Sequence, residues 1–166
     1  MCGIVGYTSL KKLDLDHKKI VKELKHRGPD SQSYLNLNSK KNHLFFGFTR
    51  LAIQDQNSRS NQPFLFKNLI ICFNGEIYNF NKIKSELKKE NIKFETNSDT
   101  EVLIKLIYFK GLKAALNKIE GMWAFSLYNK KTKKLILCRD RFGEKPLWYI
   151  KTSKTLYFSS EISIFK

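Results

Sequence analysis

Alternating hydrophobic and polar residues mark both ends of the chain, and apolar residues spaced three or four apart mark its middle. The alternation predicts strands and the wider spacing predicts helices. The predicted strands span residues 4–7, 33–37, 44–48, 69–73, 123–128, 135–139, 147–150 and 156–159. The predicted helices span residues 14–26, 80–90, 99–109 and 112–119. Strands at both ends with helices grouped between them indicate an α+β fold rather than a parallel doubly wound sheet.

Signals at the ends of these elements refine the prediction. Residues 27–30 break the first helix, residues 38–42 form a polar turn, and the strand over 69–73 is expected to end at Asn74-Gly75. Ser98 or Asp99 is expected to cap the helix that follows it. Because no repeat, low-complexity tract or linker divides the sequence, we expect one domain over residues 1–166.

Composition supports a folded protein that does not cross a membrane. Hydrophobic residues make up 42% of the 166 residues, enough to bury a sizeable core. No run approaches the ~18 apolar residues that a membrane span requires. Residues 1–7 have no basic region followed by an apolar run, so no secretory signal is expected. These features predict a cytoplasmic protein.

The charge balance is strongly basic. There are 31 lysines and arginines against 15 acidic residues, a formal net charge of +16. This excess fits either a nucleic-acid partner or lysines on a solvated surface. The lysine pairs are scattered between apolar segments, without zinc-finger spacing or the aromatic signature of an RNA-binding sheet. We therefore favour the solvated surface and expect no nucleic-acid partner.

The three cysteines indicate neither a disulfide framework nor a metal site. Cys2, Cys72 and Cys138 are odd in number and widely spaced. Cys72 and Cys138 lie in apolar runs and are expected to be small buried residues of strands.

Cys2 differs because removal of Met1 would leave it with a free α-amine. One residue would then hold a thiol nucleophile and a base whose pKa is roughly 7.7–8.0. The neutral amine can accept the thiol proton and later return it to a leaving group. The competing interpretation is that cysteine stands at position 2 by chance.

A series of motifs in a fixed order decides between these interpretations. They are residues 1–6 (MCGIVG), 26–30 (HRGPD), 49–53 (TRLAI), 61–63 (NQP), 73–79 (FNGEIYN), 98–102 (SDTEV), 121–125 (GMWAF) and 139–147 (RDRFGEKPL). This series resembles the glutaminase domain of class II glutamine amidotransferases, in the branch of the glutamine-hydrolysing asparagine synthetases. The resemblance covers nearly the whole chain. It implies an N-terminal nucleophile hydrolase fold, a four-layer αββα sandwich.

The resemblance also implies hydrolysis of L-glutamine to glutamate and ammonia through a thioester on Cys2. Asn74 and Gly75 would form the oxyanion hole with a side-chain amide and a backbone N–H. Arg50 would bind the α-carboxylate and Asp99 the α-ammonium of the substrate, with Glu76 close by. The same pocket would be lined by Leu51, Ala52, Ile53 and Gln54. Without the resemblance, Asn74-Gly75 would be an ordinary hairpin turn, Arg50 a solvated arginine and Asp99 a helix cap.

Two departures from the family pattern are visible. Family members often have histidine two residues before the arginine, where this chain has Phe48. Asparagine synthetases also continue into an ATP-using domain, and no phosphate-binding glycine loop occurs in this sequence. We therefore expect no cofactor or metal here, and expect ATP and magnesium only in a synthetase half that lies outside this chain.

The expected role is a glutaminase that supplies ammonia to a synthetase domain or subunit, with aspartate as the expected acceptor. Two alternatives stay open at this point. One is a basic nucleic-acid-binding protein on a degenerate amidotransferase scaffold. The other is an N-terminal nucleophile amidase for a different amide, which would leave Arg50 and Asp99 without partners.

Overall fold

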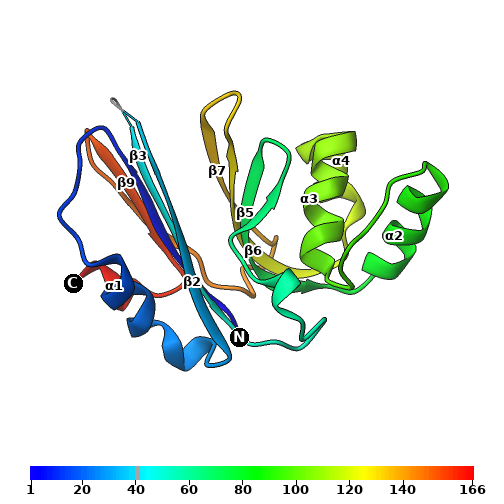
Figure 1. Cartoon of the computed structure of the whole chain (residues 1–166), viewed down its shortest axis with the longest axis horizontal. Helices are drawn as coiled ribbons and strands as arrows, with labels where there is room; N and C mark the ends of the chain where they lie inside the picture. Colours follow the sequence, from blue (N-terminus) through cyan, green and yellow to red (C-terminus); the bar gives the residue numbers. More distant parts are fainter. Residues whose placement is uncertain (40–41) are drawn as a thin grey trace.

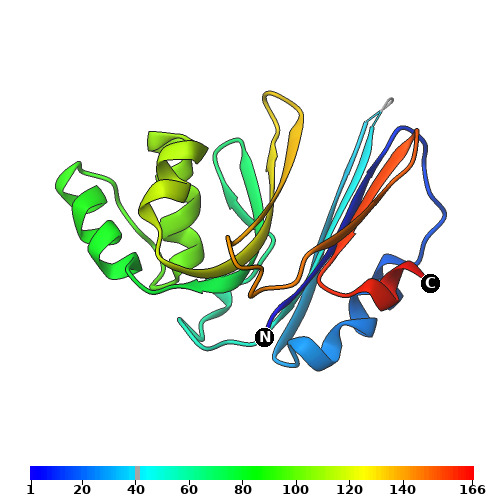
Figure 2. The same ribbon diagram turned by 180° about the vertical axis from the view of Figure 1, so that it is seen from behind.

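Two antiparallel sheets face each other, and helices cover their outer faces (Figures 1 and 2). The structure, a computed structural model, describes residues 1–39 and 42–166. The first sheet has the strand order β2-β3-β1-β9-β8 and the second has the order β4-β5-β6-β7. The strands are β1 (Gly3–Ser9), β2 (Ser31–Asn38), β3 (His43–Arg50), β4 (Phe64–Phe66), β5 (Leu69–Ile77), β6 (Gly121–Asn129), β7 (Lys134–Arg139), β8 (Trp148–Lys151) and β9 (Thr155–Ser159). The helices are α1 (His17–Glu23), α2 (Phe80–Lys89), α3 (Asp99–Lys110) and α4 (Leu112–Lys118), with 3₁₀ turns at Lys25–Arg27, Ser58–Ser60 and Ile162–Phe165.

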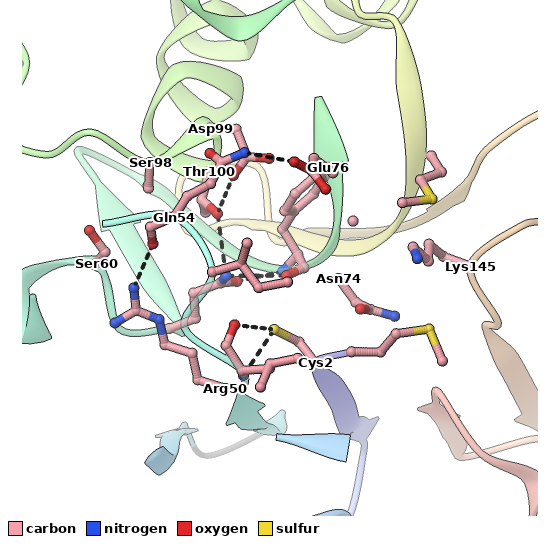
Figure 3. A pocket seen from close by; sticks show the side chains of 17 residues that line it. Cys2, Arg50, Gln54, Ser60, Asn74, Glu76, Ser98, Asp99, Thr100 and Lys145 are labelled. Atoms are coloured by element: carbon pink, nitrogen blue, oxygen red, sulfur yellow. Dashed lines mark hydrogen bonds between the residues drawn. The ribbon is translucent and has the colours of Figure 1, made fainter. Parts of the chain in front are cut away.

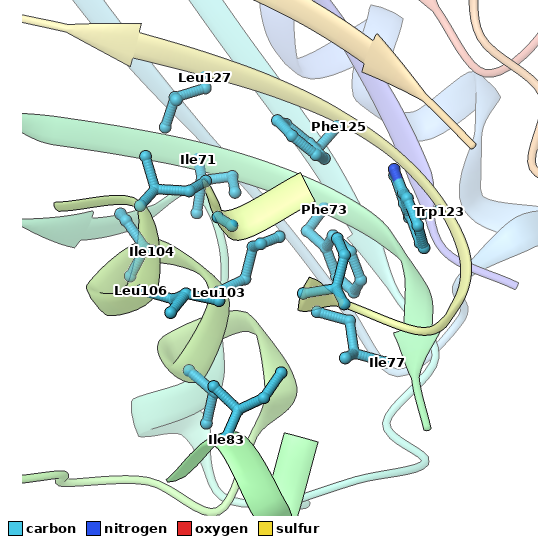
Figure 4. Packing of buried hydrophobic residues seen from close by; sticks show 14 of the residues in the cluster. Ile71, Phe73, Ile77, Ile83, Leu103, Ile104, Leu106, Trp123, Phe125 and Leu127 are labelled. Carbon is cyan, nitrogen blue, oxygen red and sulfur yellow. The ribbon is translucent and has the colours of Figure 1, made fainter. Parts of the chain in front are cut away.

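Alternation along the strands builds the layers. On β3, Phe46 faces the second sheet while its neighbour Phe45 packs with α1. On β5, Ile70 faces the first sheet while Ile71 packs with α2, α3 and α4. Figure 4 shows this last cluster, in which the side chains of β5 and β6 meet those of α3. Three apolar layers therefore separate four layers of secondary structure, which confirms the predicted α+β, αββα arrangement.

Most of the predicted elements are present, and three differ from expectation. The first helix is shorter than predicted, beginning at His17 after the Asp16 cap and ending at Glu23 before a 3₁₀ turn. The short strand β4 was not predicted. Strand β5 does not end at Asn74-Gly75 but continues to Ile77, because β6 pairs with it along its whole length. The turn predicted over residues 38–42 includes residues 40 and 41, which lie outside the described residues.

The caps and cysteines can be compared directly with expectation. Ser98 caps α3, since its side chain accepts the Glu101 N–H, while Asp99 is the first helical residue. Cys72 is fully buried between the sheets, as predicted, and Cys138 is only half-buried. Of the helices in residues 1–39 and 42–166, none is both long and apolar enough to cross a lipid bilayer.

The register of the first sheet places the N-terminus against the second sheet. Strand β1 is its central strand, and Gly3 pairs with Thr49 of β3. This pairing brings Cys2 next to Arg50 and Leu51, where β3 ends. The N-terminus lies between the two sheets in both views (Figures 1 and 2). The predicted nucleophile therefore lies where the sandwich narrows.

Candidate active site

A cavity of about 120 Å³ opens at this end of the sandwich. Its walls come from Cys2, the end of β3, the loop after it, the second half of β5 and the start of α3. The residues that line it are Met1, Cys2, Arg50, Leu51, Ile53, Gln54, Ser60, Gln62, Phe73, Asn74, Gly75, Glu76, Ser98, Asp99, Thr100, Met122 and Lys145. In Figure 3, Asp99 and Glu76 lie on one side of this cavity and Cys2 and Arg50 on the other.

The Cys2 thiol is held by a main-chain neighbour. Its Sγ lies 3.5 Å from the Leu51 N–H nitrogen and 3.7 Å from the Leu51 carbonyl oxygen. Arg27 Nε donates to the Cys2 carbonyl at 3.1 Å and thereby fixes the backbone at residue 2. Burial raises the pKa of the Cys2 thiol, and the Leu51 N–H, the terminal ammonium and Arg50 offset only part of that rise. The thiol therefore rests protonated near neutral pH and needs a proton acceptor in order to react.

Asn74 and Gly75 bring hydrogen-bond donors to the same cavity. Asn74 is buried, and its Nδ2 has no hydrogen-bond partner within the described part of the chain. A buried donor without an acceptor is costly, so such a group points to a ligand. Both residues lie inside β5, so the predicted sharp turn at Asn-Gly is wrong. Gly75 is glycine because a Cβ there would lie 2.3 Å from the Met122 carbonyl oxygen of β6.

Arg50 is a buried cation surrounded by neutral oxygens. Its guanidinium donates to the Asn57 carbonyl at 3.0 Å, to Asn61 Oδ1 at 2.8 Å and to the Gln54 and Asp55 carbonyls. No carboxylate pairs with it in the part of the chain that the structure describes. The interpretation of Arg50 as a solvated strand-end arginine is therefore wrong, and its charge is available to an anion.

Asp99 is a buried anion on the far side of the cavity. Its Oδ2 accepts the Ile77 N–H at 3.0 Å. Burial raises the pKa of Asp99 to about 6, against the hydrogen bonds from Ile77 and Thr100, and the nearby Glu76 adds to the rise. Glu76 itself accepts from Gln54 Nε2 at 3.3 Å. Among residues 1–39 and 42–166, no cation pairs with Asp99.

The structure brings the predicted site residues together with one exception. Ala52 does not line the cavity, because its N–H donates to Asp30 Oδ2 at 2.7 Å on the outside of the loop. The sequence analysis gave no role to Ser60, Gln62, Thr100, Met122 and Lys145, which also line it. All of these except Ser60 fall inside motifs of the resemblance, and that was the available signal. In Figure 3, Lys145 lies on the side of Asn74 that is away from Cys2.

Comparison with known proteins gives this cavity a context. A family model of the glutamine amidotransferase domain matches residues 1–166. Asparagine synthetase [glutamine-hydrolyzing] 1 of Bacillus subtilis is 38% identical to the chain over 97% of the chain and 26% of that protein. Asparagine synthetase [glutamine-hydrolyzing] 2 of the same organism is 36% identical over 98% of the chain and 22% of that protein. The chain thus spans about a quarter of the length of these relatives.

Solved structures confirm the fold. The chain matches glutamine phosphoribosylpyrophosphate amidotransferase from Bacillus subtilis with a TM-score of 0.81, at 22% identity over 99% of the chain and 43% of that protein. A structure described as the allosteric regulatory enzyme of purine biosynthesis matches with a TM-score of 0.83 over the same shares. These matches show the N-terminal nucleophile hydrolase fold, and together with the family match they do not favour the nucleic-acid-binding or other-amidase alternatives. The chain therefore belongs to the glutamine amidotransferase domain family, in the form found in glutamine-hydrolysing asparagine synthetases.

Proposed function

We propose that this chain hydrolyses L-glutamine to L-glutamate and ammonia with Cys2 as the nucleophile. One observation supports this most strongly. A single cavity holds the Cys2 thiol, the Asn74 Nδ2 group, and two buried charges of opposite sign on Arg50 and Asp99. Within the ranges that the structure describes, Asn74 Nδ2 has no hydrogen-bond partner and neither charge has a counter-ion. An α-amino acid with a side-chain amide carries the groups that complement all four.

Substrate recognition would use the two charges. The α-carboxylate would meet Arg50 at its Nε or in place of one of the loop carbonyls that now accept from the guanidinium. The α-ammonium would meet the Asp99 carboxylate, with Glu76 beside it. A substrate that lacks either group would leave one buried charge unpaired, and this selects an amino acid over a simple amide.

Attack would begin with proton transfer. After Met1 is removed, the neutral α-amine of Cys2 accepts the thiol proton, and the thiolate adds to the side-chain carbonyl carbon of glutamine. The carbonyl oxygen becomes an oxyanion, which Asn74 Nδ2 and the Gly75 N–H bind. No histidine lines the cavity among the described residues, and the α-amine belongs to the same residue as the thiol, so we assign the amine as the proton acceptor.

Breakdown of this intermediate would return the proton. The carbon–nitrogen bond breaks as the Cys2 ammonium protonates the leaving amide nitrogen, which releases ammonia and leaves a thioester on Sγ. The same amine then takes a proton from water, and the resulting hydroxide displaces the thiolate. Glutamate leaves, and the thiol recovers its proton from the amine.

The ammonia would serve a synthesis carried out by other polypeptide. We propose that residues 1–166 form the glutaminase unit and that a synthetase domain or subunit uses the ammonia to amidate an acceptor, aspartate first among the candidates. The names and lengths of the relatives support this division. ATP and magnesium would bind to that synthetase part, and we place the reaction in the cytoplasm, where free thiols such as these three persist.

The test is ammonia release from L-glutamine together with the mass of the N-terminus. The protein without Met1 should release ammonia, and Cys2→Ala should lose activity by at least ~10³-fold because the nucleophile is gone. Protein that retains Met1, assayed before and after treatment with methionine aminopeptidase, should gain activity only on trimming.

Cys138→Ala is the matched control, since it removes a half-buried thiol on β7 and should keep full activity. Full turnover by Cys2→Ala, or by protein whose mass shows an intact Met1, would contradict the proposal. The absence of any glutamine turnover by fully trimmed protein would contradict it as well.

A further inference from the structure

Among the described residues, no strand pairs with the outer edge of β5 where β5 enters the cavity. Strand β4 pairs with residues 69–71 of β5 and ends at Phe64, opposite Ile71. In an antiparallel ladder, every second residue directs its N–H and C=O to the same edge. Ile71, Phe73, Gly75 and Ile77 therefore direct theirs toward the β4 side, and the last three extend beyond β4.

A side chain takes the place of the missing strand at Phe73. The Phe73 N–H donates to Gln62 Oε1 at 2.5 Å, and Gln62 Nε2 donates to the Phe73 carbonyl at 3.1 Å. This is the pair of bonds that a neighbouring strand residue would make. Gln62 is buried, and its Nε2 also lies 3.3 Å from Thr100 Oγ1 at the start of α3. The amide thus joins β5 to the helix that carries Asp99.

Beyond Phe73, two more N–H groups point to this edge: within the described part of the chain, the Ile77 N–H has an acceptor and the Gly75 N–H does not. Asp99 accepts the Ile77 N–H. Gly75 cannot turn its N–H toward β6, because the opposite residue, Trp123, uses its N–H and C=O on Asp140 at 3.2 and 2.8 Å. For the Gly75 N–H, no side-chain acceptor exists in the described ranges, and Gly75 lines the cavity.

We propose that Gln62 is a positioning residue for the oxyanion hole. Its side chain pairs with the Phe73 backbone as a neighbouring strand residue would, so the β5 edge is satisfied up to Asn74. Among the residues described, the Gly75 N–H is left as an unpaired donor that faces the reacting amide. This inference rests on the proposed function of the cavity. Gln62 does not touch the substrate in this role, and its effect is exerted through the backbone of residues 73–75.

The test is Gln62→Met, which keeps the length of the side chain and removes every hydrogen bond. Loss of an oxyanion donor costs on the order of 10²–10³ in rate, so we expect kcat for glutamine to fall about 10²-fold while KM changes less than about twofold. Alkylation of Cys2 by iodoacetamide involves no oxyanion and should keep the rate of the unmodified protein. Gln56→Met, an exposed glutamine of the same loop, is the matched control and should change none of these.

A second variant and a second measurement keep the inference testable. Gln62→Glu retains an acceptor for the Phe73 N–H, so this variant should fold even if Gln62→Met does not. Its kcat should fall about tenfold, which is less than the fall expected for Gln62→Met. Amide hydrogen exchange followed by NMR needs no turnover at all. In the unmodified protein, the Phe73 and Ile77 amides should exchange more slowly than Gly75 by about tenfold or more, and Gln62→Met should release Phe73 while leaving Cys72, which faces β6, unchanged.

Each remaining outcome decides the matter. The inference is wrong if kcat is unaffected, if kcat, KM and the alkylation rate all shift together as in a general loosening, or if the Gly75 amide is as protected as Phe73. If the unmodified, trimmed protein does not hydrolyse glutamine, the proposed function fails, and amide exchange alone then decides the part that concerns Gln62.

Discussion

Acidification should weaken glutamine binding through Asp99. Burial raises the pKa of this carboxyl to about 6, so it is ionised at neutral pH and protonated in mild acid. Only the ionised form can pair with the substrate ammonium. If binding requires that form, the dissociation constant increases by the factor 1 + 10^(6 − pH), which is about 1.1 near pH 7 and about 11 near pH 5.

Calorimetric titration of the Cys2→Ala variant with L-glutamine measures this without turnover. The dissociation constant should be flat above pH ~7 and rise about tenfold per pH unit well below 6. Asp99→Asn should bind weakly and show no such rise, since its amide does not titrate. A dissociation constant that stays constant from pH ~7.5 to ~5 in the Asp99 protein would refute the reasoning.

The same pKa has a consequence for stability, with the opposite sign to that of an ordinary carboxylate. An unfolded aspartate titrates at about 3.9, so between about 3.9 and 6 the folded protein holds a proton that the unfolded chain has lost. Stability therefore falls as pH rises through this window, and above pH ~6 the ionised Asp99 costs roughly 3 kcal/mol. Urea denaturation at pH ~7 should find ligand-free Asp99→Asn more stable than the unmodified protein, and near pH 3.5 the difference should vanish.

Two further substitutions test the walls of the cavity. Asp55→Asn tolerates the local φ of 41°, but its amide cannot accept both of the N–H groups that the carboxylate now accepts, one of them from Asn97 at 2.6 Å. Because the Asp55 carbonyl also accepts from Arg50, KM for glutamine should rise about three- to tenfold with kcat unchanged. The control Asp16→Asn should leave both constants unchanged, and an unchanged KM in Asp55→Asn would contradict this role. Gly75→Ala would place a Cβ 2.3 Å from a main-chain oxygen of β6, so urea denaturation should show a loss of about 2 kcal/mol or more, and equal stability would be inconsistent with this packing.

Local patterns were sufficient to predict most of the fold, whereas the candidate site residues came from the motif series. Strand alternation and helical spacing are properties of neighbouring residues, so they can be read from sequence wherever an element is long. Strand β4 has only three residues and left too little pattern to detect. The motif series placed Cys2, Arg50, Asn74 and Asp99 in one site because the resemblance carries contacts between distant segments, which periodicity does not.

What the sequence could not predict depends on pairing between distant segments. Asn-Gly is a common turn dipeptide, and only pairing with β6 shows that Asn74-Gly75 lies inside a strand. The Gln62 amide finds its partner on Phe73, eleven residues away, where no local preference links the two. The neutral oxygens around Arg50 likewise come from a polar loop whose path has no periodic pattern.

Asn74 and Gly75, the two proposed oxyanion donors, lie on a strand, so the proposed chemistry depends on the register of β5. Asn74 projects its side chain perpendicular to the sheet, on the face that Ile70 and Cys72 share with the first sheet and Cys2. The Gly75 N–H lies in the plane of the sheet, so adjacent residues offer donors from two directions at one point. If β5 slipped by one residue, the Asn74 side chain would face the helices and the Gly75 N–H would pair with β6. The cavity would then lose both donors.

Asp140 protects against that slip. Its carboxylate accepts the N–H groups of Trp123, Phe142, Glu144 and Lys145, and its own N–H donates to the Trp123 carbonyl. These bonds commit the polar groups of Trp123 to the β7 side and leave Gly75, opposite it, without a partner on β6. Burial raises the pKa of Asp140, but the four N–H groups more than offset this and hold it below its usual value, so the clamp stays charged at neutral pH. Asp140, the residue that follows β7, therefore helps to keep the Gly75 N–H free, and this gives the 139–147 motif a physical link to the cavity.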